Sequence, residues 1–268
     1  MREARAATTP DGRFSYVMSG DEDATPVVFL HGIGGGARLW SNQLASFARR
    51  YRAIALDLPG YGGSQPLGQT SIRSYAEAVA SFVDSLRPAS PVLVGHSIGG
   101  MILQTYLADG LGPVRAAVLA QTTPAFGGKD PRWAEDFVAA RLGPLDRGET
   151  MRSLAPSIAT SLLGDDPDPH AFHLARDCVA GVPEATWRAS VLALVGFDRR
   201  EALARISVPT LLIAGSKDQN APAPTMAKMA EKVPGAEFLC LDGIGHLAFA
   251  EAPAAFDRAV LSFLERRL

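Results

Sequence analysis

The sequence predicts an α/β protein in which a mostly parallel sheet carries helices on both faces. Short apolar runs alternate with stretches of helical apolar spacing from residue 27 to residue 122, and again from residue 209 onward. Between residues 123 and 200 this alternation stops, and only helical patterns occur. We therefore expect a core formed by residues 1–122 and 201–268, with a helical cap of residues 123–200 inserted into it.

The first half of the chain supplies most of the expected sheet. Its short apolar runs predict strands at residues 27–30, 52–56, 91–94 and 116–119. Apolar residues at a spacing of three or four predict helices at residues 38–50, 71–86 and 100–107. Pro88 ends the second of these helices, because proline cannot continue one.

The second half begins with helices and then returns to the alternating pattern. Gly-Pro and Asp-Pro pairs separate the helices expected at residues 133–142, 150–163, 170–179 and 183–194. After them come a strand at residues 209–214, a helix at 225–232, a strand at 237–241 and a helix at 254–266. The cap should cover the C-terminal edge of the strands, where open α/β sheets bind their ligands.

Composition excludes several classes of partner. The 268 residues are 47% hydrophobic and carry a formal net charge of −2, so we expect neither a nucleic-acid nor a membrane partner. Residues 1–9 contain no apolar stretch typical of a secretion signal, which favours a cytoplasmic protein. Cys178 and Cys240 have no metal-binding spacing; we expect both to be buried and unpaired, with no metal or cofactor. Homo-oligomerisation is left open.

The segment Gly95-His96-Ser97-Ile98-Gly99 carries the strongest chemical signal. It is a G-x-S-x-G motif placed between an expected strand and an expected helix, the context in which the motif forms a nucleophile elbow. Glycine on both sides of the serine allows the sharp turn, because larger side chains would clash with neighbouring backbone. The turn places Ser97 at a helix N-terminus, where free N–H groups can stabilise an oxyanion.

A serine nucleophile needs a general base, and the base needs an orienting acid. His246 lies between the last expected strand and the last helix, so it can reach the sheet edge above Ser97. Asp218 directly follows the strand at residues 209–214 and precedes His246, which is the order Ser, Asp, His. The loop after the strand at residues 116–119 contains no carboxylate, which strengthens Asp218 as the acid.

The other histidines are less suited to act as the general base. His96 is adjacent to the serine, and neighbours at a tight turn do not share a face. His170 and His173 fit exposed helix positions.

An oxyanion hole needs two positioned N–H donors. The backbone of Ile98 follows the nucleophile, and Ile33 lies in the glycine-rich loop at residues 31–36. A phosphate-binding loop is the competing interpretation. It is disfavoured because the lysine and serine or threonine of a P-loop are missing, as is the acidic residue of a dinucleotide site.

Aromatic and apolar residues of the cap and core are candidates for a substrate pocket, although the same spacing also fits plain core packing. The cap candidates are Trp133, Phe137, Phe172 and Trp187. The core candidates are Ile33, Met101 and Leu247. An acidic substrate would favour an arginine near the pocket, and the cap offers Arg132, Arg141, Arg176 and Arg188.

These motifs, in this order, resemble the α/β-hydrolase superfamily. The resemblance runs from residue 27 to residue 264 and includes Asp57-Leu-Pro-Gly-Tyr-Gly-Gly-Ser64, Gly-Ser-Lys-Asp218 and Gly-Ile-Gly-His246. It implies an α/β-hydrolase fold with an eight-stranded sheet and one antiparallel strand near its start, with the first strands at residues 14–18 and just before. The loop at residues 57–64 is expected to be structural, so Asp57 is not assigned a catalytic role.

The serine nucleophile separates this chain from the dehalogenases and epoxide hydrolases of the fold, which use aspartate at the elbow. The cap and its exit look similar to 3-oxoadipate enol-lactonases and small esterases, which implies cleavage of a small carboxylic ester or lactone. Carbon–carbon bond hydrolases of meta-cleavage products are an alternative, but they usually carry asparagine where this chain has His96. Cofactor-free perhydrolases and non-catalytic receptors of the fold are further alternatives.

Overall fold

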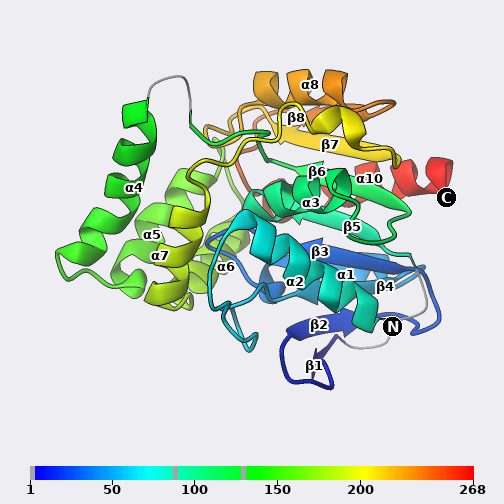
Figure 1. The fold of residues 1–268 in the computed structure, drawn as a ribbon, viewed down its shortest axis with the longest axis horizontal. Helices are drawn as coiled ribbons and strands as arrows, with labels where there is room; N and C mark the ends of the chain where they lie inside the picture. Colours follow the sequence, from blue (N-terminus) through cyan, green and yellow to red (C-terminus); the bar gives the residue numbers. More distant parts are fainter. Residues whose placement is uncertain (1–3, 87–89, 128–130) are drawn as a thin grey trace.

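The computed structural model describes residues 4–86, 90–127 and 131–268 and has one eight-stranded sheet (Figure 1). The strand order is β1-β2-β4-β3-β5-β6-β7-β8, and neighbouring strands from β4 to β8 pair in parallel. β2 is antiparallel to both of its neighbours. The expected eight-stranded sheet with one antiparallel strand near its start is therefore confirmed.

Most strands coincide with the short apolar runs of the sequence. Their bounds are β1 (Arg5–Thr8), β2 (Ser15–Ser19), β3 (Pro26–Leu30), β4 (Arg52–Leu56), β5 (Val92–His96), β6 (Ala116–Ala120), β7 (Thr210–Gly215) and β8 (Glu237–Leu241). Every residue of β3, β5, β6 and β7 is buried, as expected for central parallel strands covered on both faces.

The helices follow the expected alternation. The core helices are α1 (Ser41–Phe47), α2 (Ile72–Ser85), α3 (Ile98–Ala108), α8 (Ala223–Lys232), α9 (Ala248–Glu251) and α10 (Pro253–Arg267). The helices between β6 and β7 are α4 (Pro131–Asp146), α5 (Met151–Leu162), α6 (Pro169–Ala180) and α7 (Glu184–Ala193). The described residues also form two short 3-10 helices, η1 (Ala37–Trp40) and η2 (Leu203–Arg205). In the described ranges, no helix is long and apolar enough to cross a bilayer.

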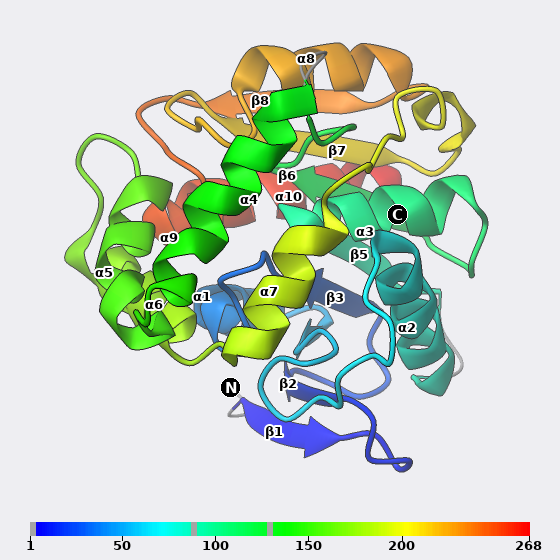
Figure 2. The ribbon, with the colours of Figure 1, turned by 60° about the vertical axis from the view of Figure 1, so that its left-hand side comes forward.

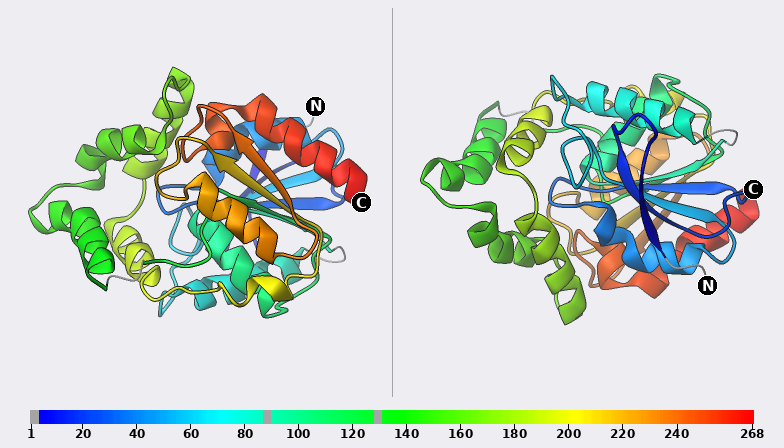
Figure 3. Two further views of the ribbon diagram at one scale, coloured as in Figure 1. Left: turned by 90° about the horizontal axis from the view of Figure 1, so that it is seen from above. Right: turned by 90° about the horizontal axis from the view of Figure 1, so that it is seen from below.

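Two hydrophobic clusters hold helices against the two faces of the sheet. Along β3, Val28 and Leu30 join the cluster that contains α2, α3 and α8, whereas Val27 and Phe29 join the cluster of α1, α9 and α10. This division follows from the two-residue repeat of a strand. Figure 3 shows α1 and α10 on one side of the sheet and α2 and α3 on the other.

Helices α4 to α7 gather on one side of the molecule, beside the sheet rather than on either face (Figures 1 and 2). Contacts from α6 and α7 tie this group to the core. Val179 of α6 reaches the glycine-rich loop at Gly34, and Thr186 of α7 donates a hydrogen bond to the carbonyl of Gly60. Within this segment, the described residues form no strand beyond an isolated bridge between Ala125 and Asp198.

Three local expectations need correction. The helix expected from residue 38 begins as the 3-10 helix η1 and ends at Phe47. α4 continues past its expected end at residue 142 and ends at Asp146, so Pro144 lies within its last turn, where little of the helix remains to be disrupted. Cys240 is exposed rather than buried, since β8 lies at the edge of the sheet, and Cys178 is only half-buried.

Candidate active site

The G-x-S-x-G segment forms a strained turn between β5 and α3. Ser97 has φ 56° and ψ −119°, a backbone conformation that non-glycine residues rarely adopt. A Cβ atom on Gly95 would lie 2.5 Å from the carbonyl oxygen of Gly99, and one on Gly99 would lie 2.5 Å from that of Leu30. Both positions therefore require glycine, because neighbouring backbone lies too close for a Cβ atom. This close packing of the backbone holds Ser97 at the turn.

The glycine-rich loop packs directly against this elbow. A Cβ atom on Gly32 would lie 2.9 Å from Nδ1 of His96 and 3.2 Å from Cβ of Ser97. The next residue is Ile33, whose N–H donates no hydrogen bond to any other described residue; the same is true of Ile98 at the start of α3. The two amides expected to form an oxyanion hole are thus both unpaired beside the serine.

His31 and Asp57 hold the glycine-rich loop in place. His31 Nδ1 donates to the carbonyl of Gly32 at 2.7 Å, and His31 Nε2 accepts from the N–H of Leu58 at 3.0 Å. The Asp57 carboxylate accepts the N–H of Ala37 at 2.7 Å. These contacts match the structural role expected of the loop at residues 57–64.

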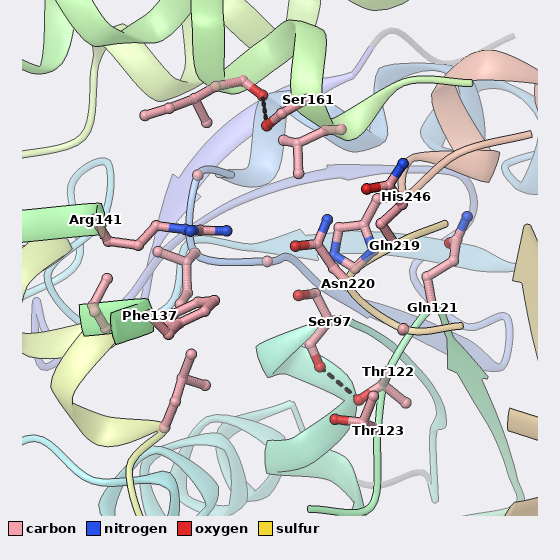
Figure 4. Close-up of a pocket in the computed structure, with 18 of the residues that line it drawn as sticks. Ser97, Gln121, Thr122, Thr123, Phe137, Arg141, Ser161, Gln219, Asn220 and His246 are labelled. Carbon is pink, nitrogen blue, oxygen red and sulfur yellow. Dashed lines mark hydrogen bonds between the residues drawn. The ribbon is translucent and has the colours of Figure 1, made fainter. Parts of the chain in front are cut away.

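The structure brings together Asp218, after β7, and His246, after β8. His246 Nδ1 lies 2.8 Å from Oδ2 of Asp218, and both side chains are almost completely buried. The other Asp218 oxygen, Oδ1, accepts the N–H groups of Asn220 at 2.8 Å and Ala221 at 3.0 Å. Figure 4 shows the side chains of Ser97 and His246 directed toward each other at one wall of a cavity.

The Asp218 carboxylate is held in its charged form. Burial raises its pKa, but His246 and the two backbone N–H donors lower it, and the net effect is a pKa below the usual value for aspartate. An ionised Asp218 requires a proton on Nδ1 of His246, which leaves Nε2 free to accept a proton.

Three residues that sequence reasoning missed hold the His246 loop. His96 Nε2 donates to the carbonyl of His246 at 2.7 Å, and Gln121 Nε2 donates to the carbonyl of Gly245 at 3.1 Å. Glu251 accepts the N–H groups on both sides of His246. Of the three, only His96 lies within a motif, directly before the nucleophile, and this place was the one signal in the sequence for such a role. Gln121 and Glu251 belong to no motif.

A cavity of about 880 Å³ lies between these catalytic candidates and helices α4 to α7. Ser97, His96 and His246 form part of its wall. The residues expected to form a substrate pocket also line it, namely Ile33, Met101, Trp133, Phe137, Trp187 and Leu247. Phe172 does not line it, because its side chain packs with the cluster of α1, α9 and α10 instead.

Most of the remaining sequence candidates do not line the cavity. His170 and His173 are exposed on α6, as expected. Of the four candidate arginines Arg132, Arg141, Arg176 and Arg188, only Arg141 lines the cavity. Among the residues that the structure describes, no three His, Cys, Asp or Glu side chains are grouped so that they could hold a metal ion.

The family of the chain follows from its sequence match. Residues 27–259 match the profile of the alpha/beta hydrolase family. The chain belongs to this family. The position of Ser97 between β5 and α3, and of Asp218 and His246 after β7 and β8, agrees with the membership.

Several known proteins align with most of this chain. It is 32% identical to a dihydrolipoyllysine-residue acetyltransferase component of an acetoin cleaving system from Pseudomonas putida, covering 92% of the chain but only 65% of that protein. It is 28% identical to 3-oxoadipate enol-lactonase 1 from Acinetobacter baylyi, covering 94% and 92% of the two chains. The enol-lactonase structure from Burkholderia xenovorans superposes with a TM-score of 0.84 at 22% identity, covering 97% and 100%, which shows the shared fold.

Proposed function

We propose that this protein is a serine hydrolase that cleaves a small carboxylic ester or lactone through an acyl-enzyme. One observation carries the proposal. Ser97, on a strained elbow, and His246, 2.8 Å from Asp218, line the same cavity. A nucleophile, a base and an orienting acid in this relation are what acyl transfer requires.

In the acylation step, Ser97 Oγ attacks the carbonyl carbon while His246 Nε2 takes the hydroxyl proton. Asp218 holds the proton on Nδ1 and stabilises the imidazolium that forms. The N–H groups of Ile33 and Ile98 donate to the negative oxygen of the tetrahedral intermediate. As the carbon–oxygen bond breaks, His246 returns its proton to the leaving alkoxide; in a lactone, this alcohol stays attached to the acyl chain.

In the deacylation step, water takes the place of the alcohol. His246 Nε2 accepts one proton from the water as its oxygen attacks the acyl carbon of the ester on Ser97. Collapse of the second tetrahedral intermediate releases the carboxylic acid and returns the proton to Ser97 Oγ.

The proposal also covers the role of residues 123–200 and the kind of bond that is cleaved. Residues 123–200 would act as a cap, since α4, α5, α6 and α7 all contribute side chains to the cavity wall. The enol-lactonase among the relatives supports ester or lactone cleavage. None of the relatives named above favours a carbon–carbon bond hydrolase, a perhydrolase or a receptor. The acetyltransferase component is longer than this chain, so its name adds no activity here.

The direct test is labelling with a fluorophosphonate, which reacts with activated serines, followed by peptide mass spectrometry. We expect one adduct on Ser97 and none in the Ser97→Ala variant. A panel of p-nitrophenyl esters, lactones and dienol diketones then identifies the reaction. Absence of labelling, together with tight ligand retention and no turnover, would instead support a receptor.

A further inference from the structure

Arg141 places a positive charge in the wall of a cavity whose lining is mostly apolar. It comes from α4, and Figure 4 shows its guanidinium extending into the cavity from the side opposite Ser97. Besides His96 and His246, it is the only ionisable side chain among the described residues that line this space. No aspartate or glutamate of the described lining offsets its charge.

The other arginines of α5, α6 and α7 are in ordinary surroundings. Arg176 pairs with Asp177, and Arg188 pairs with Asp146, and neither lines the cavity. Arg152 on α5 is exposed to solvent, where an arginine without a partner costs little. Arg141 differs, because within the described part of the chain it has no carboxylate partner and yet is partly buried.

The surroundings of Arg141 fix its position without neutralising it. Its guanidinium lies over the ring of Phe137, with the central carbon 4.1 Å from the ring centre. The indole N–H of Trp187 on α7 donates to the backbone carbonyl of Arg141 at 3.4 Å. Burial lowers the pKa of Arg141, but arginine stays charged at neutral pH.

From this arrangement we infer that Arg141 binds a carboxylate of the substrate, so that the natural ester or lactone is an anion. The inference rests on the proposed ester cleavage and specifies its substrate class. A guanidinium presents parallel N–H donors that match a carboxylate in a two-point contact. The partial burial of Arg141 strengthens that contact, because fewer water molecules compete for either charge than on an exposed surface.

The position of Arg141 across the cavity also separates binding from chemistry. A charge that contacts a remote carboxylate acts equally on substrate and transition state, so its loss raises KM more than it lowers kcat. The neighbouring hydroxyls are less suited to bind an anion. Those of Ser157 and Ser161 both donate to backbone carbonyls of α5.

The test compares matched esters that differ only in one charge. The first pair is p-nitrophenyl hydrogen glutarate and p-nitrophenyl methyl glutarate, in which the carboxylate is on the acyl side. The second pair is 4-acetoxybutanoate and its methyl ester, in which the carboxylate is on the alcohol side. Each is assayed with wild type, Arg141→Gln, Arg141→Lys and, as a matched control from the same group of helices, Arg152→Gln.

We expect wild type to prefer the anionic member of at least one pair by on the order of 10-fold or more in kcat/KM, as for other charge-assisted contacts. Arg141→Gln should lose this preference through a higher KM for the anionic ester, and a circular dichroism spectrum that matches wild type should show that the variant is folded. Arg141→Lys should keep part of the preference and Arg152→Gln all of it. Equal use of both members of each pair by wild type, or a preference that survives in Arg141→Gln, would overturn the inference.

A binding measurement separates this inference from the proposed function. Calorimetric titration of the Ser97→Ala protein with free glutarate detects the anion site without turnover. Binding that disappears in the Ser97→Ala, Arg141→Gln double variant supports the site, even if no ester is cleaved. Turnover of neutral esters without any glutarate binding supports the hydrolase and refutes the site.

Discussion

His96 Nε2 lies 2.7 Å from the backbone carbonyl oxygen of His246, across 150 positions of sequence. A carbonyl can only accept, so the proton of the His96 ring must be on Nε2. Burial holds the pKa of His96 well below its usual value, so the ring is neutral. The residue before the nucleophile therefore positions the proposed general base.

The first prediction concerns this contact. His96→Ala should lower kcat about 5-fold, because a buried hydrogen bond of about 1 kcal/mol that orients His246 is lost. KM for a neutral ester should change little. Steady-state kinetics with p-nitrophenyl acetate would measure both, with the exposed His170→Ala as control. An unchanged kcat would show that the contact does not position the base.

The second prediction concerns the nucleophile and its backbone. Ser97→Ala and Ser97→Gly should both reduce kcat by about 10⁴-fold or more. Ser97→Gly should nevertheless be more stable than Ser97→Ala by about 1 kcal/mol, because only glycine relieves the strain of φ 56°. Urea unfolding of the two variants makes the comparison. Equal stability would mean that the elbow stores no strain.

The third prediction concerns the acid. In Asp218→Asn the side-chain oxygen can still accept the N–H groups of Asn220 and Ala221, so the new NH₂ group faces His246 Nδ1. That donor moves the imidazole proton to Nε2, the wrong tautomer for a base. We expect kcat to fall by about 10⁴-fold with little change in thermal stability. Retention of more than a tenth of the activity would argue for another acid.

The fourth prediction concerns pH and stability. Burial lowers the pKa of both His31 and His96 in the folded protein, whereas unfolded histidine titrates near 6.5. Below about pH 6.5 the unfolded chain binds protons that the folded chain does not, so the free energy of unfolding should fall as pH drops from 7 to 5. Asp218, whose pKa is also lowered, adds its share only below about pH 4.

Denaturant unfolding between pH 8 and pH 5 measures this slope. His96→Asn removes one of the two imidazoles whose pKa burial lowers and should make the slope shallower, while His173→Asn on the exposed face of α6 should leave it unchanged. A slope that is flat in wild type, or equal in wild type and His96→Asn, would contradict the assignment of the effect to these rings.

Local pattern was sufficient for most of the fold. The apolar runs that became β3, β4, β5 and β6 lie within two residues of their expected bounds, because a buried strand needs a short apolar run. The clearest disagreement is α4, which passes through Pro144. A Gly-Pro pair therefore predicts the end of a helix too early when it lies in the last turn, where few backbone hydrogen bonds remain to be lost.

The sequence by itself determined the fold family and the candidates Ser97, Asp218 and His246. Each of them follows an apolar strand, and parallel strands bring their C-terminal ends to one edge. Only the tertiary structure decided what surrounds them. The Glu251 carboxylate accepts the N–H of Gly164, 87 positions away in the sequence, and of the four candidate arginines only Arg141 lines the cavity. Such choices depend on how α4 to α7 pack against the core, and helical spacing does not encode which face of a cap helix turns inward.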